Sequence, residues 1–266
     1  MEYNTLVEVI AAVHLSKYVQ SPYPQYGGIM LVAPPGAFKS TVTETLNEFA
    51  TTTVISDINV QSLLKMKDSF LSQRITTMAF SDFAKLYKRH GATADNVEGI
   101  LMALVEEGFR KASFESQTTG CIPAYCTVIG GMTTSFFESK VDDWEDNGFL
   151  RRFLFARYRV QGLEVIEEAI QEWRRVNFND GFIPKVPNSR LIPYKLEKPE
   201  IAVITRGVIH QHSTSGANIA MQKIYCVLKW KFQKEPERAM FILKDFLPCL
   251  SKEGGTLLLK EKKTDR

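Results

Sequence analysis

The stretch Ile29-Met-Leu-Val-Ala-Pro-Pro-Gly-Ala-Phe-Lys-Ser-Thr41 decides the fold that we predict for this chain. An apolar run leads into two prolines and a glycine, and a lysine and two hydroxyl residues follow before a helical pattern begins. A phosphate-binding loop needs this order, because a buried strand must deliver a tight turn and a helix N-terminus whose N–H groups face anionic oxygens. We therefore predict a phosphate-binding loop that contains Pro35, Gly36, Ala37, Phe38, Lys39, Ser40 and Thr41.

Two side chains of this loop have distinct predicted roles. Lys39 would reach the β- and γ-phosphates, and the Ser40 hydroxyl would bind Mg²⁺. The usual pattern is G-x-x-x-x-G-K-S/T, whereas this chain has Ala33 at the first glycine and Phe38 directly before the lysine. The alternative is that Pro-Pro-Gly is only a turn and Lys39 an exposed first-turn residue. The preceding strand, the Lys-Ser-Thr triplet and the following helix favour the phosphate site.

Strand-like and helix-like segments alternate from residue 29 to residue 160, which is typical of a three-layer α/β unit with a mostly parallel sheet. We predict a P-loop NTPase core over residues 1–161. The remaining residues, 162–266, change in character and predict a mainly helical lid with a winged-helix-like C-terminal part. The expected strands cover 29–33, 52–57, 74–80, 125–129 and 153–160 in the core, and the expected helices cover 4–19, 39–49, 60–72, 95–112, 163–173 and 215–233.

Composition excludes several protein classes. The 266 residues are 44% hydrophobic and 24% charged, with a net charge of +3, which is ordinary for a soluble globular protein. Four scattered cysteines do not form a disulfide framework and favour a reducing, cytoplasmic location. We expect no secretory signal, and no apolar run approaches the ~20 residues of a membrane span.

The loop also carries a family resemblance. The string Ala33-Pro-Pro-Gly-Ala-Phe-Lys-Ser40 resembles the loop of the minichromosome-maintenance branch of the AAA+ ATPases, which reads G-x-P-G-x-(A or other)-K-S. That branch also lacks a glycine directly before the lysine. Related loops occur in ATPases of phages and plasmids, which the chain resembles as well. The resemblance implies ATP and Mg²⁺ as cofactors, with Lys39 as phosphate ligand and Ser40 as metal ligand.

An ATPase of this kind needs a carboxylate at the end of a neighbouring strand, to hold the Mg²⁺ shell and polarise the attacking water. Asp82 follows an apolar strand and is the best-placed candidate, and Asp57 is the alternative. Asp82 would otherwise serve as a helix N-cap. The family pattern is Asp-Glu, but Phe83 follows here, so the usual catalytic glutamate is missing. Glu107 and Glu115 are possible replacements that the sequence does not place.

Thr133 and Thr134 follow the predicted strand 125–129 and its Gly-Gly pair. In the family this place holds a polar residue, often asparagine, that contacts the γ-phosphate or the water. The resemblance implies that Thr133, or else Thr134, takes this role. The alternative is a helix cap after a buried strand.

The segment Gly148-Phe-Leu-Arg-Arg-Phe153 resembles the arginine-finger segment of the family. A planar, permanently charged guanidinium suits phosphate oxygens. Arg152 fits the position before the phenylalanine, and Arg151 is the alternate. A finger acts on the nucleotide of a neighbouring subunit, so this reading implies a homo-oligomer. The alternative is that the two arginines lie on the surface and balance the negative charge of the acidic run 142–146.

The aromatic and basic string 229–234, Lys-Trp-Lys-Phe-Gln-Lys, is typical of contact with a nucleic acid backbone and equally of a solvated helix face. We therefore predict an ATP-binding and ATP-hydrolysing AAA+-type motor or loader acting on DNA, helicase-like or in the replication of a mobile element. One alternative is a nucleotide-sensing adaptor that binds ATP without efficient hydrolysis. A weaker alternative is a P-loop kinase with a substrate pocket at 161–210.

Overall fold

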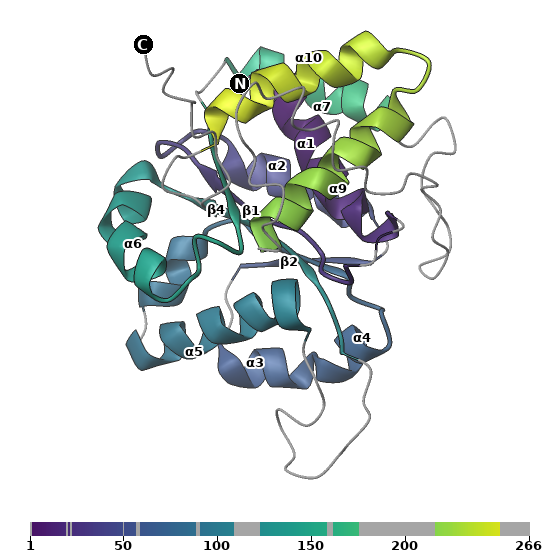
Figure 1. Cartoon of the computed structure of the whole chain (residues 1–266). Helices are drawn as coiled ribbons and strands as arrows, with labels where there is room; N and C mark the ends of the chain where they lie inside the picture. The colour runs from purple at the N-terminus through teal and green to yellow at the C-terminus, as the bar shows by residue number, and fades with distance from the viewer. Residues whose placement is uncertain are drawn as a thin grey trace, which may run out of the picture.

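The computed structural model describes residues 2–19, 21, 23–49, 51–56, 59–88, 91–108, 123–158, 162–175 and 216–250. Within these ranges the chain forms an α/β structure in which helices cover both faces of one sheet (Figure 1). None of the described helices combines the length and the apolar character that a bilayer crossing requires.

The sheet has five strands, all parallel, in the order β2-β3-β4-β1-β5. β1 therefore lies between β4 and β5, and the apolar run of the opening stretch becomes a fully buried inner strand. This burial on both faces explains its continuous apolar sequence, because helices cover a parallel sheet on each side. The strands are β1 (Gly28–Val32), β2 (Thr52–Ile55), β3 (Thr77–Phe80), β4 (Thr127–Met132) and β5 (Leu154–Arg157).

Alternate residues of β1 enter two separate cores. Ile29 and Leu31 pack among the helices of one face, and Met30 and Val32 pack among those of the other. The first face carries α1 (Tyr3–Leu15), α2 (Lys39–Thr45), α7 (Leu163–Arg174), α9 (Gly216–Lys231) and α10 (Pro236–Phe246). The second carries α3 (Val60–Lys65), α4 (Lys67–Leu71), α5 (Gly91–Met102) and α6 (Thr134–Asp146). Short 3-10 segments are η1 (Ser16–Tyr18), η2 (Leu46–Glu48), η3 (Phe83–Lys88) and η7 (Leu247–Cys249), and the π-helical segment η4 (Ala103–Glu107) extends α5.

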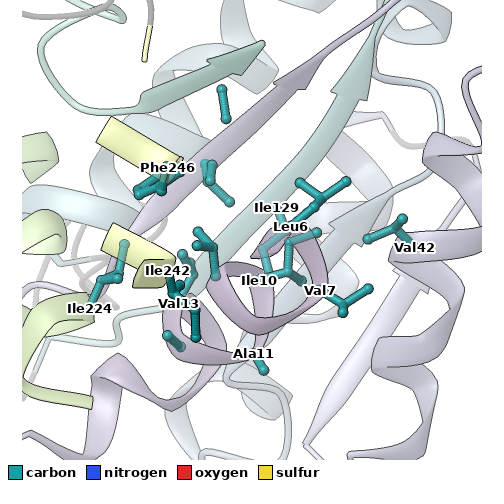
Figure 2. Packing of buried hydrophobic residues seen from close by; sticks show 14 of the residues in the cluster. Leu6, Val7, Ile10, Ala11, Val13, Val42, Ile129, Ile224, Ile242 and Phe246 are labelled. Atoms are coloured by element: carbon teal, nitrogen blue, oxygen red, sulfur yellow. The ribbon is translucent and has the colours of Figure 1, made fainter. Parts of the chain in front are cut away.

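Helix α1 is the centre of the first face. Every residue of it except Asn4 is buried, although the sequence pattern predicts only one apolar stripe. The reason is that α7, α9 and α10 also pack against α1, so that Val13 belongs to the same buried cluster as Ile224 and Ile242 (Figure 2). A helix covered on all sides needs apolar residues all round.

The helices after residue 161 thus share one hydrophobic core with α1 and the sheet. The predicted three-layer α/β architecture with a parallel sheet agrees with this structure. The division into a core and a lid near residue 161 stays a prediction about domains, although the described part of the C-terminal region packs onto the sheet layer. The residues after 250, at the end of the predicted winged-helix-like part, lie outside the described residues.

Candidate functional site

The loop 33–38 joins the carboxyl end of β1 to the start of α2. Gly36 has φ of +75°, and Phe38 has φ of 51° and ψ of 28°, both in the left-handed region. Helix α2 then begins at Lys39 and continues through η2 as far as Glu48. A left-handed residue followed by a helical one turns successive backbone N–H groups toward the same side and forms an anion-binding concavity. The Phe38–Lys39 step has this conformation.

The Lys39 side chain folds back over the loop. Its Nζ donates hydrogen bonds to the carbonyl oxygens of Ala33, at 3.1 Å, and Pro34, at 2.7 Å. Partial burial lowers the pKa of Lys39, and the negative charge of Asp82 opposes that shift. The ammonium group is therefore held at the mouth of the loop by two carbonyls that a phosphate could replace.

The ends of β3 and β4 close the site from one side. The Ala33 N–H donates to the carbonyl of Met132 at 3.2 Å, which joins the loop to the end of β4. Gly131 lies so close to the loop that a Cβ atom there would stand 3.2 Å from Lys39 Cβ and 3.1 Å from the Ser81 carbonyl oxygen. The next residue, Asp82, is partly exposed. The structure thus brings together Lys39 and Asp82, which the sequence pairs only by hypothesis.

The arrangement of helices places this site at a topological switch. The helix that follows β1 packs on one face of the sheet, whereas α5 and α6, which follow β3 and β4, pack on the other. Ligands of open α/β sheets bind beyond the carboxyl ends of the strands at such a point. Asp82, which is partly exposed, and the exposed Ser40 are the two predicted oxygen ligands of the metal. Mg²⁺ usually takes one or two carboxylates together with substrate phosphates and water, so this small donor set fits it.

Thr133 also lies at the carboxyl end of the sheet, directly after β4. Its Oγ1 accepts a hydrogen bond from the Phe136 N–H at 3.3 Å and caps the N-terminus of α6. The capping alternative is therefore correct, and a contact between this hydroxyl and a γ-phosphate stays a prediction. Thr134 is the first residue of the helix.

Arg152 is at the other end of the sheet. It precedes β5, whose Leu154 pairs with Ile29 near the start of β1. The guanidinium is buried, with Nε 2.5 Å from Glu106 Oε2 and Nη2 3.0 Å from Glu107 Oε1. The reading of Arg152 as an exposed surface arginine is therefore wrong. A finger role in trans stays a prediction, and it would require Arg152 to leave these partners, whereas Arg151 is exposed.

The structure describes one of the two residues proposed to replace the missing glutamate. Phe83 is fully buried among aromatic rings, with its centroid 5.7 Å from that of Phe80 and 5.9 Å from that of Phe149. Glu107 is paired with Arg152 at the amino end of the sheet, so it does not reach the loop. Glu115 and the alternative metal ligand Asp57 lie outside the described residues.

The basic string near residue 230 is not an open patch. The Lys231 side chain is buried in an ion pair with Glu8 of α1, and Phe232 is buried beside it. The Lys229 ammonium stands over the Tyr225 ring, 5.9 Å from its centroid. A nucleic acid contact by Lys231 or Phe232 is therefore excluded in this structure, because both side chains are buried.

Sequence reasoning missed Tyr158, which contacts the loop directly. Its hydroxyl donates to the carbonyl of Ala37 at 2.5 Å. Tyr158 follows β5, and only the pairing of β5 with β1 brings it to the loop. No local motif marks it, although the strand pattern 153–160 includes it.

Comparison with known proteins adds no assignment to this geometry. No protein-family model matches the chain, and no curated protein matches it at a significant level.

Proposed function

We propose that this chain binds ATP with Mg²⁺ at the loop 33–41 and hydrolyses it as an AAA+-type motor or loader. One observation carries the proposal: the Lys39 ammonium rests on two loop carbonyls where the carboxyl ends of β1, β3 and β4 meet, close to the charge of Asp82. The left-handed Phe38 supports it, because a non-glycine residue in that region is uncommon and is found at functional sites.

Each residue has a defined task in this proposal. Lys39 exchanges its carbonyl partners for phosphate oxygens and neutralises charge that develops during phosphoryl transfer. Ser40 and Asp82 hold the metal shell, and the N–H groups at the start of α2 bind phosphate oxygens. A Mg²⁺ ion held by these two residues would supply positive charge that stabilises the negative charge on the phosphates. Thr133 would orient the attacking water.

Equilibrium binding of ATP, with and without Mg²⁺, tests the first part of this proposal. Lys39→Ala should weaken ATP binding by about 100-fold, because the variant loses the only charged side chain that the proposal assigns to the phosphates. Lys65→Ala is the matched control, since Lys65 is an exposed lysine of α3 on the other face of the sheet. An unchanged ATP affinity in Lys39→Ala would refute the phosphate site.

A second function has its own supporting observation. Phe83 occupies the place of the catalytic glutamate and is fully buried, which favours a nucleotide-sensing adaptor that binds ATP without efficient turnover. Steady-state hydrolysis separates the two functions, because appreciable turnover excludes the adaptor. The assay should include single-stranded DNA, since DNA as the substrate rests on the family resemblance. Sizing with a slowly hydrolysed ATP analogue then tests whether the nucleotide drives assembly.

A further inference from the structure

Tyr158, directly after the neighbouring strand β5, makes a short hydrogen bond to the loop. Its hydroxyl donates to the Ala37 carbonyl at 2.5 Å, and its side chain is only 5% exposed. The Tyr158 backbone N–H also lies 3.4 Å from the Val32 carbonyl, which continues the β1–β5 ladder past the end of β5. The donor is therefore fixed to the sheet on one side and to the loop on the other.

This hydrogen bond orients one peptide group of the loop. The peptide unit between Ala37 and Phe38 is planar, so its C=O and its N–H point in opposite directions. With the carbonyl directed at Tyr158, the Phe38 N–H is directed away from it. That N–H is the first of the consecutive N–H groups of Phe38, Lys39 and Ser40, which the left-handed conformation of Phe38 turns toward one side.

The hydrogen bond from Tyr158 to the Ala37 carbonyl helps to hold a strained turn. The left-handed conformation costs a residue with a Cβ atom roughly 1–2 kcal/mol. Phe38 incurs this cost, whereas a glycine would not. The Phe38 ring packs against the core of the first face, and the Tyr158 hydroxyl holds the preceding carbonyl. Together these contacts keep the strained turn in one conformation. Burial raises the pKa of the Tyr158 hydroxyl, so the donor stays protonated at neutral and mildly alkaline pH.

We infer that Tyr158 is a positioning residue of the phosphate loop: by holding the Ala37 carbonyl it aims the Phe38 N–H at the phosphates of the nucleotide. The inference rests on the proposed ATP site. It explains how the loop functions without the glycine that usually precedes the lysine. A glycine adopts the left-handed conformation without strain, whereas here the hydrogen bond from Tyr158 holds Phe38 in that conformation.

The test compares two conservative substitutions that each remove one buried tyrosine hydroxyl. Tyr158→Phe removes the donor to the loop, and Tyr18→Phe removes a hydroxyl that bonds Thr51 at the opposite end of the sheet. Tyr18 is 6% exposed, so the two sites are matched in burial. Dissociation constants for ATP, ADP and pyrophosphate are measured by calorimetry, together with the thermal unfolding of each variant.

We expect Tyr158→Phe to weaken all three ligands by about threefold to tenfold, which corresponds to the loss of one oriented hydrogen bond. Tyr18→Phe should stay within about twofold of the wild type, while both variants lose thermal stability to a similar extent. A merely structural role of Tyr158 would change the melting temperature without this selective loss. Unchanged ligand affinity in a folded Tyr158→Phe variant overturns the inference and leaves the ATP site intact. Wild-type protein that binds no nucleotide overturns the proposed function itself.

A second measurement decides the matter if Tyr158→Phe does not fold. Amide hydrogen exchange of the wild type at Phe38, followed by NMR, should slow on addition of ATP, because the phosphate would accept from that N–H. Slowing supports the inference. Exchange at Phe38 that ATP leaves unchanged, while Lys39 or Ser40 becomes protected, overturns it.

Discussion

At the carboxyl end of the sheet, Lys39 is half-buried and its ammonium binds two backbone carbonyls of an exposed turn. At the amino end of the same sheet, the Lys17 ammonium is instead enclosed by side chains. Its Nζ donates to the hydroxyls of Thr76, at 2.5 Å, and Thr51, at 3.1 Å, and lies 3.4 Å from Nε2 of His14. Burial lowers the pKa of Lys17 to about 7. Both lysines have hydroxyl residues nearby, yet only one faces an open turn.

The amino end is built as packed interior. The His14 Nδ1 is 2.9 Å from Thr77 Oγ1, and the His14 ring stacks on Phe49 with centroids 4.1 Å apart. Burial and the charge of Lys17 hold the pKa of His14 well below its ordinary value. The three protons of the Lys17 ammonium already have partners in Thr51, Thr76 and His14. A lysine beside hydroxyl groups is thus no phosphate site unless convergent backbone N–H groups accompany it.

The largest expected effect concerns Arg152, which belongs to the packed amino end. Arg152→Ala should lower the free energy of unfolding by about 3 kcal/mol, because it removes the positive charge that is paired with the partly buried Glu106 carboxylate. Arg151→Ala removes an exposed neighbour and should change stability by less than about 0.5 kcal/mol. Urea unfolding measures both. Equal, small losses would show that the amino end is less rigid than the comparison assumes.

The same pair tests the finger in trans. If the assembled protein needs an arginine from a neighbouring subunit, the exposed Arg151 can supply it without breaking an ion pair. Arg151→Ala should then lower ATP turnover in the oligomer and leave ATP affinity unchanged. Turnover that falls only in a stable, folded Arg152 variant such as Arg152→Lys would assign the role to Arg152 instead.

The next effect is a pH dependence of stability that originates at Lys17. In the unfolded chain its pKa returns to about 10.4, so above about pH 7 the unfolded state holds a proton that the folded state has lost. The free energy of unfolding therefore rises with pH, by up to about 1.4 kcal/mol per pH unit for one proton. Lys17→Met should remove this contribution, and denaturation at pH 7.0 to 8.5 measures the slope.

Two other groups determine the design of that experiment. Lys223, whose pKa burial lowers to about 8, contributes in the same direction. Cys126, whose pKa burial raises to about 12, contributes in the opposite direction above its ordinary value of about 8.5. The difference in slope between the wild type and Lys17→Met isolates Lys17. Identical slopes would mean that Lys17 keeps its ordinary pKa in the folded protein.

The sequence predicts much of the structure at the carboxyl end of the sheet and little at its amino end, for a physical reason. Lys39, Ser40 and the left-handed Gly36 follow one another along the chain, so their geometry is local and can be read from the strand–turn–helix pattern. Tyr158 and Gly131 reach the loop only through strand pairing, which no local period encodes. The alternative reading of Arg152 as a surface arginine was wrong because its partners, Glu106 and Glu107, come from η4, about 45 residues earlier in the chain.

The helices show the same limit. The period of α1 correctly predicts a helix, but its burial on all sides depends on α7, α9 and α10, which begin at residue 163 or later. The ion pair between Lys231 and Glu8 is likewise not predictable, because the two residues are far apart in the sequence. The strands β1, β3 and β4 are predictable because each is apolar and is flanked by turn signals, whereas their order in the sheet is not.

A smaller effect is expected from Asp82, the proposed metal ligand at the carboxyl end of the sheet. Asp82→Asn should lower the affinity for ATP in the presence of Mg²⁺ by about tenfold, because an amide is a weaker ligand than a carboxylate for a hard cation. ATP affinity without Mg²⁺ should not fall, since a carboxylate beside the phosphates only repels them. Asp68→Asn, an exposed carboxylate of α4, is the control. If Mg²⁺ still strengthens binding in Asp82→Asn but not in Asp57→Asn, Asp57 is the ligand.

The smallest effect tests how tightly the end of β4 packs on the loop. A Cβ atom at Gly131 would stand 3.2 Å from Lys39 Cβ and 3.1 Å from the Ser81 carbonyl oxygen, so Gly131→Ala must displace one of them by a few tenths of an ångström. We expect ATP affinity to fall by about threefold, with little loss of secondary structure. Gly99→Ala is the matched control, because the Cβ would meet nothing within 4 Å on the exposed side of α5, and alanine there should stabilise the helix. The comparison between the two ends of the sheet predicts that only the first substitution changes ATP binding. An ATP affinity unaffected by Gly131→Ala would mean that Lys39 acts without support from β4, and that the loop alone determines its position.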